Sequence, residues 1–380
     1  MSRESAIESL RAAARGRRVV LGHDWLTGMR GGERCLELIC RAFPDAPLAT
    51  LLANPAAVSE PIRSREIVTS WLQRIPGIAR HYRRLLPLMT GAARSLRVPE
   101  GDLFLTTSSC VAHAFRPPTA EMRMVCYCFT PMRYAWLFPK EYLGPAKAAL
   151  AAPYFAHLRR WDRAHSGRVD RYVAISEHVR QRIRDFYGRE SDVVYPPVDT
   201  DRCTPAPDGG SPQDGTYDLV VSALVPYKRI DLAVEAYSRS GRPLKIVGTG
   251  SGAAKLAARA ASNIEFLGWR RDDEVLDLYR HCRFLLFPGE EDFGIVPLEA
   301  MACGRPVVAF RRGGATETVQ EGVSGVFFDD QNPDALDEAV SRAAAMKWKP
   351  AAIRARAERF GVDQFLEGLA RSISLAFEGR

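Results

Sequence analysis

The sequence has no uninterrupted run of roughly 18 apolar residues, the length that a membrane-spanning helix needs. The stretch from Met1 to Arg18 alternates Arg and Glu with Ala and has no apolar core of the kind found in secretory signal peptides. The eight cysteines show no paired metal-ligand spacing, and the closest pair, Cys126 and Cys128, lies in an apolar run typical of a buried strand. No internal repeat or low-complexity segment is present. We therefore expect a cytoplasmic protein with neither a zinc site nor a disulfide.

The length and composition are those of a globular protein of more than one domain. A chain of 380 residues exceeds the size at which one hydrophobic core keeps growing. Lysine and arginine outnumber acidic residues 30 to 19 in residues 1–200, whereas the remainder carries 23 against 26. This asymmetry indicates that only the first half meets an anionic partner, and membrane phospholipid, a lipid-diphosphate acceptor and nucleic acid are all candidates.

Short apolar runs of strand length alternate with helical segments along the whole chain. The runs predict strands at 18–22, 102–106, 124–128, 171–175, 193–194, 218–222, 244–247, 264–267, 284–287, 306–309 and 325–328. Residues 196–216 are rich in proline and glycine and predict a linker. The pattern predicts an α/β protein of two doubly wound, parallel-sheet domains of the Rossmann type, at 1–205 and 206–355. A final helical stretch over roughly 351–378 is expected to return to the first domain through residues 356–380. Ligands of such sheets bind at the carboxyl ends of the strands, so the expected site faces the cleft between the domains.

The most informative segment is residues 288–310, PGEEDFGIVPLEAMACGRPVVAF. It predicts a strand ending at Phe287, a loop over 288–294, and a helix that begins near Ile295 with Pro297 in its first turn. The N–H groups of Gly294, Ile295 and Val296 would lie at the positive end of this helix, where a diphosphate can bind. Two carboxylates flank that position, Glu291 and Glu299. Taken alone, such a pair of glutamates is more often an ordinary loop acid and an ordinary acid on the helix surface.

The flanking residues decide between these interpretations. The segment resembles the donor-binding signature of glycosyltransferase family 4, retaining enzymes with the GT-B fold, whose E-x7-E motif is matched by Glu291 and Glu299. Five further blocks are similar to the mannosyltransferase-type branch of this family, and together they extend over nearly the whole chain: HDWLTGMRGGER (23–34), YCFTPMRYAW (127–136), YPPVDTDRC (195–203), LVPYKRIDLAVEAY (224–237) and FRRGGATETVQEGVSGVFF (310–328).

The resemblance implies roles for particular residues. Glu291 would hold hydroxyls of the donor sugar, Glu299 would bind the ribose, and Lys228 would meet the diphosphate. The donor-binding set also includes Phe293, Gly294, Ile295, Val296, Gly248 and Gly250. Gly31 and Gly32 would form a phosphate or acceptor loop, although a simple tight turn requires the same glycines. His113 and Arg133 are placed on the acceptor side, and for His113 a structural role is the alternative. No metal or cofactor is expected, because this fold usually needs no bound metal.

Two positions depart from the family pattern. Ala223 stands where relatives usually carry an Arg five residues before the Lys, and we predict that Arg229 supplies the missing charge. Phe129 stands where many relatives have a His, which removes a polar group from the expected site. A catalytically weakened, sugar-binding relative is therefore an alternative. The glycine-rich turn over 248–252 lacks the spacing of a dinucleotide fingerprint, so NAD binding is not predicted.

Residues 70–97 interleave apolar side chains with arginines at positions 74, 80, 83, 84, 94 and 97. This pattern is typical of a basic segment that lies on an anionic membrane, and a solvated helix face with ordinary core contacts is the alternative. Peripheral association with the inner face of the plasma membrane would suit a polyprenyl-linked acceptor.

The predicted function is transfer of a hexose, with mannose from GDP-mannose favoured, to a carbohydrate or lipid-linked acceptor in surface polysaccharide or glycolipid biosynthesis. A nucleotide-sugar 2-epimerase shares the fold and is the first alternative. A basic nucleic-acid-binding protein is the alternative from another class, but no motif of that kind appears.

Overall fold

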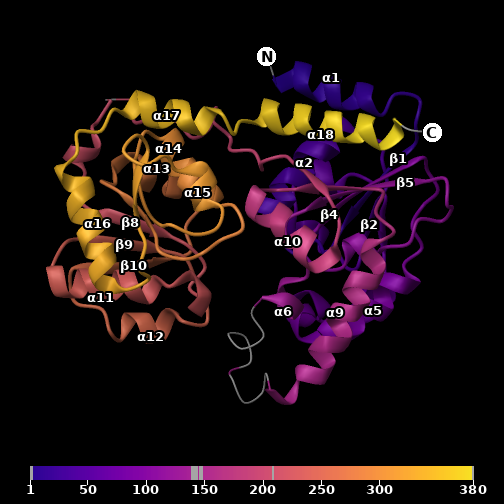
Figure 1. The fold of residues 1–380 in the computed structure, drawn as a ribbon, viewed down its shortest axis with the longest axis horizontal. Helices are drawn as coiled ribbons and strands as arrows, with labels where there is room; N and C mark the ends of the chain where they lie inside the picture. The colour runs from indigo at the N-terminus through magenta and orange to yellow at the C-terminus, as the bar shows by residue number, and fades with distance from the viewer. Residues whose placement is uncertain (1–2, 138–143, 145–148, 208, 379–380) are drawn as a thin grey trace. The chain divides into compact units, whose positions relative to one another are not determined.

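The computed structural model describes residues 3–137, 144, 149–207 and 209–378, which form two compact units (Figure 1). The first unit comprises residues 1–196 and 362–380, and the second comprises residues 197–361. Each unit is built on its own parallel sheet, as the alternation of strands and helices predicts.

The first unit contains a seven-stranded parallel sheet in the order β3-β2-β1-β4-β5-β6-β7. The central strands β1, β4 and β5 are almost entirely buried, which is why their residues read as continuous apolar runs. The strands are β1 (Val19–His23), β2 (Leu48–Thr50), β3 (Ile67–Thr69), β4 (Leu103–Ser108), β5 (Arg123–Cys128), β6 (Arg171–Ala174) and β7 (Ser191–Val193).

Helices and short 3-10 turns connect these strands. The α-helices are α1 (Arg3–Ala13), α2 (Gly31–Ala42), α3 (Glu60–Arg63), α4 (Ile78–His81), α5 (Leu86–Ser95), α6 (Arg133–Trp136), α9 (Ala152–Ser166), α10 (Glu177–Tyr187) and α18 (Val362–Phe377). The 3-10 turns are η1 (Pro55–Ala57), η2 (Trp71–Arg74), η3 (Tyr82–Leu85) and η4 (Ala112–Ala114). The predicted cap of α10 is present, since the Ser176 hydroxyl accepts a hydrogen bond of 3.0 Å from the Val179 amide.

The second unit contains a six-stranded parallel sheet in the order β10-β9-β8-β11-β12-β13, which is the strand order of a Rossmann fold. Its strands are β8 (Asp218–Val221), β9 (Leu244–Val247), β10 (Ile264–Gly268), β11 (Leu285–Phe287), β12 (Val307–Phe310) and β13 (Gly325–Phe328). Its helices and turns are η5 (Pro212–Asp214), η6 (Pro226–Lys228), α11 (Ile230–Ser240), α12 (Ala253–Ala257), α13 (Asp272–His281), α14 (Ile295–Ala302), α15 (Ala315–Thr318), α16 (Pro333–Ala345) and α17 (Pro350–Glu358).

The C-terminal helical stretch differs from the prediction, because it is two helices that belong to different units. α17 contacts α14 in the second unit, whereas α18 lies beside α1 in the first (Figure 1). The Arg17 guanidinium lies 3.9 Å above the ring centroid of Phe377, which ties the C-terminal end of α18 to the segment after α1.

The boundary between the units also lies earlier than the predicted 205/206. Residues 197–206 belong to the second unit because Arg354 on α17 donates to the carbonyls of Thr200 and Cys203, at 3.0 and 2.8 Å. The Val198 amide donates to the Phe360 carbonyl in the same way, at 2.8 Å.

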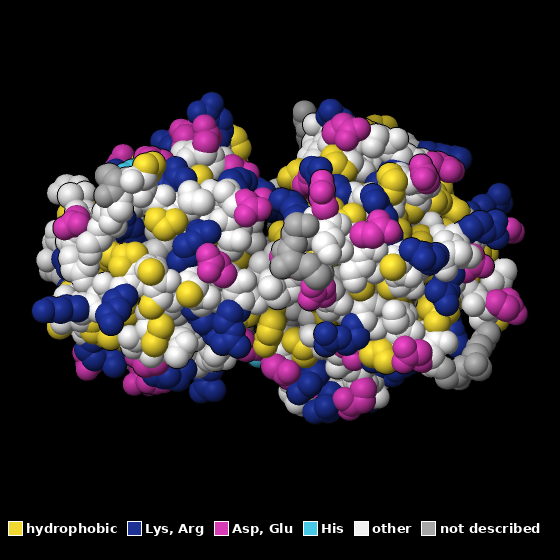
Figure 2. Space-filling model, turned by 90° about the horizontal axis from the view of Figure 1, so that it is seen from above, with side chains coloured by type: hydrophobic (Ala, Val, Ile, Leu, Met, Phe, Trp, Pro, Cys, Tyr) yellow, Lys and Arg dark blue, Asp and Glu magenta, His cyan; other side chains and the backbone are white. Residues whose placement is uncertain are grey.

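The surface carries charges of both signs. On the face shown in Figure 2, basic and acidic side chains are interspersed over each unit, with hydrophobic side chains between them. All eight cysteines are buried and free. Within the described part of the chain, no helix has the length and apolar character that spanning a bilayer requires.

Candidate active site

The predicted donor residues gather at one edge of the second sheet. The strand order reverses between β8 and β11, the two central neighbours, and ligands of open α/β sheets bind beyond the carboxyl ends of strands at such a point. β8 leads into the loop that ends in η6 with Lys228, and β11 leads into the loop over 288–294 that carries Glu291. Lys228 and Glu291 are distant in the chain, and their side chains meet because β8 and β11 are neighbouring strands.

Lys228 and Glu291 form an ion pair between Nζ and Oε2. Their side chains are 13% and 23% exposed, so the pair is partly shielded from solvent but remains accessible. Gly289 allows this approach, because a Cβ at that position would lie 3.0 Å from the Lys228 Cα and 2.9 Å from its carbonyl oxygen. A cation and a carboxylate are thus held together at the edge of the sheet where a charged ligand is expected.

Helix α14 begins immediately after this loop and presents its N-terminus at the same edge. Gly294 caps the helix with φ 94°, a left-handed conformation that favours glycine. The first N–H groups of an α-helix have no acceptor within the helix, so those of Ile295 and Val296 suit an anion. Phe293, by contrast, is only 4% exposed and its ring lies 5.9 Å from that of Phe360. It can therefore serve the donor site through its backbone.

Glu299 lies one turn further along α14 and is held by a residue that sequence reasoning missed. The Tyr279 hydroxyl on α13 donates a hydrogen bond of 3.0 Å to Glu299 Oε2. Tyr279 is 2% exposed, and burial together with the Glu299 charge raises the pKa of its phenol far above the usual value. The tyrosine therefore stays protonated and fixes the orientation of the carboxylate.

Tyr279→Phe is expected to weaken the binding of GDP or UDP about tenfold, because a hydrogen bond to a charged group contributes about 1.5–3 kcal/mol. Isothermal titration calorimetry measures this change. Tyr217→Phe is the matched control, since its hydroxyl donates to the Leu278 carbonyl on the same helix and does not touch Glu299. Equal affinities in the two variants would show that Tyr279 does not position Glu299.

The glycines of the 248–252 turn bring two backbones into contact. A Cβ at Gly248 would lie 1.8 Å from the Ser222 carbonyl oxygen, and one at Gly250 would lie 2.3 Å from that of Leu224. The Leu224 amide also donates to the Thr249 carbonyl at 2.9 Å. Gly248 and Gly250 thus secure the loop after β8, in which Ala223 is exposed.

A second glycine pair, Gly313 and Gly314 after β12, packs against the backbone of the loop that carries Glu291. The Gly314 amide donates to the Glu291 carbonyl at 2.8 Å, and a Cβ at Gly314 would lie 2.2 Å from the Phe293 Cα. The sequence signal for this contact is the GG of FRRGGATET, which the resemblance included but to which it assigned no role.

Arg229 has an unusual backbone and an engaged side chain. Its φ of 53° and ψ of 35° place it in the left-handed region. Its guanidinium contacts Asp231 at 3.3 Å and donates to Gln331 Oε1 at 2.8 Å. The sequence predicts that Arg229 supplies the positive charge of the Arg that Ala223 replaces. In the structure this charge is paired with Asp231.

In the first unit, Gly31 and Gly32 open helix α2. A Cβ at Gly32 would lie 3.1 Å from the ring of Phe129, the residue that replaces the family His, whereas one at Gly31 would meet nothing within 4 Å. Phe129 thus fills the space beside Gly32.

The reversal point of the first sheet, between β1 and β4, is occupied by a side chain of the protein itself. The Asp24 carboxylate accepts hydrogen bonds from the amides of Ser109, Val111 and Ala112, at 2.5, 2.7 and 2.7 Å. These are donors of the type that bind phosphate in other Rossmann folds.

His113 and Arg133 lie in the first unit in different environments. His113 is 2% exposed, and its Nε2 is 3.1 Å from Asp162 Oδ1, although the angle falls outside hydrogen-bonding geometry. Burial alone would lower the pKa of His113, but the Asp162 charge raises it overall. Arg133 begins α6 and is half-buried. The contacts of His113 are those of a structural residue.

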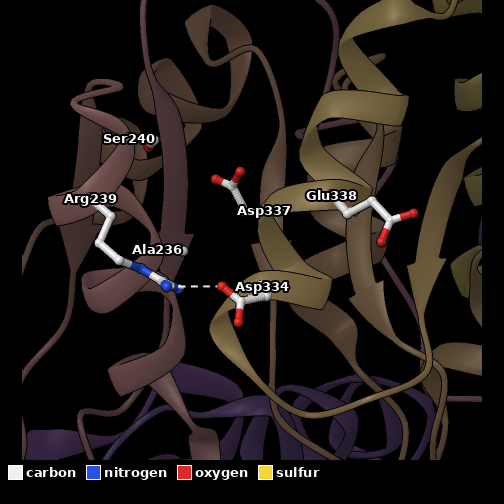
Figure 3. Close-up of a pocket in the computed structure, with 6 residues that line it drawn as sticks. All are labelled: Ala236, Arg239, Ser240, Asp334, Asp337 and Glu338. Carbon is white, nitrogen blue, oxygen red and sulfur yellow. Dashed lines mark ion pairs between the residues drawn. The ribbon is translucent and has the colours of Figure 1, made fainter.

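A pocket of about 360 Å³ lies elsewhere in the second unit, between α11 and α16 (Figure 3). Arg239 and Asp334 face each other across it and form an ion pair of 2.8 Å. The pocket is lined by Ala236, Arg239, Ser240, Asp334, Asp337 and Glu338. Its acidic lining does not suit a diphosphate.

Comparison with known proteins agrees with this geometry. Residues 29–202 match the family described as Glycosyltransferase Family 4, and residues 206–360 match the one described as Glycosyl transferases group 1. The chain belongs to glycosyltransferase family 4. Its two Rossmann-type units and returning C-terminal helix are those of the GT-B fold.

Among individual relatives, a D-inositol 3-phosphate glycosyltransferase of Acidothermus cellulolyticus is 33% identical over 233 residues, covering 53% of this chain and 52% of that protein. A GDP-mannose-dependent alpha-(1-6)-phosphatidylinositol monomannoside mannosyltransferase of Mycolicibacterium smegmatis is 30% identical over 224 residues, covering 52% and 59%. The chain spans about half the length of the curated relatives it matches. The crystal structure of Anabaena HepE in complex with UDP-glucose has a TM-score of 0.69 at 19% identity, covering 94% of this chain and 99% of that one.

Proposed function

We propose that this family 4 member is a retaining hexosyltransferase that uses a nucleotide diphosphate sugar. The observation that carries the proposal is the Lys228–Glu291 pair at the reversal point between β8 and β11, directly before the N-terminus of α14. A cation, helix amides and a carboxylate at one position match a ligand that joins an anionic diphosphate to a hydroxylated ring.

In the proposed reaction, the bond between the anomeric carbon and the diphosphate oxygen breaks, and a bond from the acceptor oxygen to that carbon forms. The negative charge that develops on the diphosphate is stabilised by Lys228 and by the amides of Ile295 and Val296. The departing diphosphate takes the proton of the acceptor hydroxyl. Retention requires that the acceptor oxygen ends on the face that the diphosphate leaves. These groups supply the positive charge without a bound metal, so transfer is expected to persist in EDTA.

Glu291 and Glu299 are proposed to bind the sugar and the ribose, which lie at the two ends of the donor. Glu291 exchanges its contact with Lys228 for hydroxyls of the sugar, while Glu299, oriented by Tyr279, holds the ribose. GDP-mannose is the proposed donor, because the sequence blocks are similar to mannosyltransferases and the M. smegmatis relative is named as GDP-mannose-dependent. The proposed acceptor is a carbohydrate or a polyprenyl-linked sugar bound to the first unit.

The test is a thermal-shift screen against GDP-, UDP- and ADP-sugars, followed by incubation of the stabilising donor with oligosaccharide and polyprenyl-diphosphate-sugar acceptors. Transfer detected by mass spectrometry, with an anomeric configuration by NMR equal to that of the donor, is the expected result. Altered free nucleotide sugar formed without an acceptor would instead identify a 2-epimerase. Stabilisation without any turnover would identify a sugar-binding relative.

We further propose that segment 70–97 of the first unit touches an anionic membrane. Trp71 and Leu88 are each 41% exposed, and Arg74, Arg94 and Arg97 are exposed as well. The side chains of Arg80, Arg83 and Arg84 lie outside the described part of the chain. Flotation with phosphatidylserine vesicles at low salt is expected to recover the protein, and Trp71→Ala to reduce recovery. Full recovery on neutral vesicles, or none on anionic ones, would contradict this.

A further inference from the structure

Arg229 occupies a backbone conformation that its neighbours must maintain. It is the only non-glycine residue with positive φ among the described residues. Every other left-handed position there is a glycine, because a Cβ makes this conformation costly. Such residues persist where surrounding contacts hold them, and they gather at ligand sites. Arg229 directly follows Lys228 and directly precedes α11.

The contacts that hold Arg229 lead to the opposite loop of the site. Its Nη1 donates to Gln331 Oε1 at 2.8 Å, and Gln331 Nε2 donates to the Pro288 carbonyl at 3.0 Å. Gln331 lies between β13 and α16, far from both partners in sequence. Its side-chain amide uses its acceptor for one loop and a donor for the other, which no carboxylate or hydrocarbon of that size can reproduce.

These contacts form a closed chain that includes both loops of the proposed donor site. Lys228 pairs with Glu291, Glu291 follows Pro288 in the same loop, and Pro288 is tied through Gln331 back to Arg229. Asp231 also contacts the guanidinium, at 3.3 Å, so much of the Arg229 charge is balanced. The Arg229 side chain therefore connects the two loops through Gln331, and its charge is balanced by Asp231 on α11.

We propose that Gln331 and left-handed Arg229 form a positioning clamp that sets the separation of Lys228 from the Glu291 loop. The inference rests on the proposed function, since it assigns Lys228 to the diphosphate and Glu291 to the sugar. The clamp acts through these two residues. It holds the contact of Lys228 with the diphosphate at a fixed distance from the contact of Glu291 with the sugar. It replaces the direct charge role that the sequence suggests for Arg229.

The test compares the binding of GDP-mannose and UDP-glucose with that of GDP and UDP by isothermal titration calorimetry. Gln331→Ala removes both hydrogen bonds and leaves Lys228, Arg229 and Glu291 in place. The expected result is about a tenfold loss of affinity for the nucleotide sugar that the wild type binds, with about a threefold loss or less for its nucleoside diphosphate. A general weakening of the fold would lower both affinities alike.

Arg239→Ala is the matched control. It removes the Arg239–Asp334 ion pair, which also connects α11 with α16 but lies at the pocket of Figure 3. Wild-type affinities are expected in this variant. Gln331→Glu keeps an acceptor for Arg229 but turns an oxygen toward the Pro288 carbonyl, so it should behave like Gln331→Ala. If Gln331→Ala does not fold, Gln331→Asn, which is one methylene too short to span both partners, carries the same expectation.

A double-mutant cycle separates the clamp from a direct charge effect. Arg229→Gly relieves the left-handed backbone and removes the guanidinium. Under the clamp, the effects of Arg229→Gly and Gln331→Ala on nucleotide-sugar affinity are non-additive, because each breaks the same connection. If Arg229 acts directly on the diphosphate, Gln331→Ala binds like the wild type, and that result overturns the clamp alone. If the wild type binds no nucleotide sugar, the clamp and the proposed function both fail.

Discussion

Lys228→Ala is expected to lower kcat/KM for the nucleotide sugar by about 10² to 10³, the usual effect of removing one preorganised group that stabilises a developing charge. Lys228 is only 13% exposed, so its attraction for the diphosphate is less screened than that of a surface lysine. Steady-state kinetics with the donor found by the thermal-shift screen measures the change.

The control is Lys245→Ala, which removes a lysine paired with Glu265 at 3.8 Å between β9 and β10. Its kinetics are expected to equal those of the wild type. Loss of Lys228 also leaves Glu291 as an unpaired negative charge beside the diphosphate. The double variant Lys228→Ala with Glu291→Gln is therefore expected to bind GDP more tightly than Lys228→Ala alone. A Lys228→Ala enzyme within threefold of the wild type would contradict the assigned role.

Asp162→Ala is expected to lower the free energy of unfolding by about 3–5 kcal/mol, because it removes a fully buried carboxylate from the centre of a polar cluster. The Asp162 carboxylate is 0% exposed. It accepts hydrogen bonds of 2.8 Å from Trp136 Nε1 and from the Tyr187 hydroxyl, and it lies 3.1 Å from His113 Nε2. Urea unfolding measures the loss.

Asp192→Ala is the control, because it breaks the half-exposed pair with Arg171 on the same unit and should cost about 1 kcal/mol or less. A loss of that size in Asp162→Ala would show that the buried cluster contributes little. Because Asp162 anchors Trp136 on α6, Asp162→Ala is also expected to disturb the segment that carries Arg133.

The same cluster gives stability a pH dependence. The pKa of His113 is raised in the folded protein: burial acts to lower it, but attraction by Asp162, and to a smaller extent by Cys126 and Asp24, outweighs burial. A group with a raised folded pKa contributes stability below its unfolded pKa of about 6.5 and loses that contribution as pH rises through the folded value. As pH rises from about 6.5 through the folded pKa of His113, the free energy of unfolding of the wild type should therefore fall relative to that of His113→Gln.

The sequence predicts most strands and both sheets because parallel strands are buried on both faces and therefore form continuous apolar runs. Two strands at one side of the first sheet were not predicted, β2 (Leu48–Thr50) and β3 (Ile67–Thr69), and each is three residues long. The break between α17 and α18 was missed because it depends on which unit each helix contacts.

For the site, the sequence supplies Lys228 and Glu291 through the family resemblance, and the strand order explains why they meet. Tyr279 and Gln331 could not be predicted, because each acts through side-chain contacts with residues distant in the chain. The conformation of Arg229 could not be predicted either, since nothing in its residue type favours positive φ. Such contacts depend on tertiary packing and leave no periodic or motif signal.

A crystal structure of the protein with its nucleotide sugar would show whether Lys228 and the N-terminus of α14 bind the diphosphate. We expect diphosphate oxygens within hydrogen-bonding distance of Lys228 Nζ and of the Ile295 and Val296 amides, with Glu291 turned to the sugar and Glu299 to the ribose. A diphosphate bound at the carboxyl ends of β1 and β4, with Lys228 still paired to Glu291, would contradict this expectation.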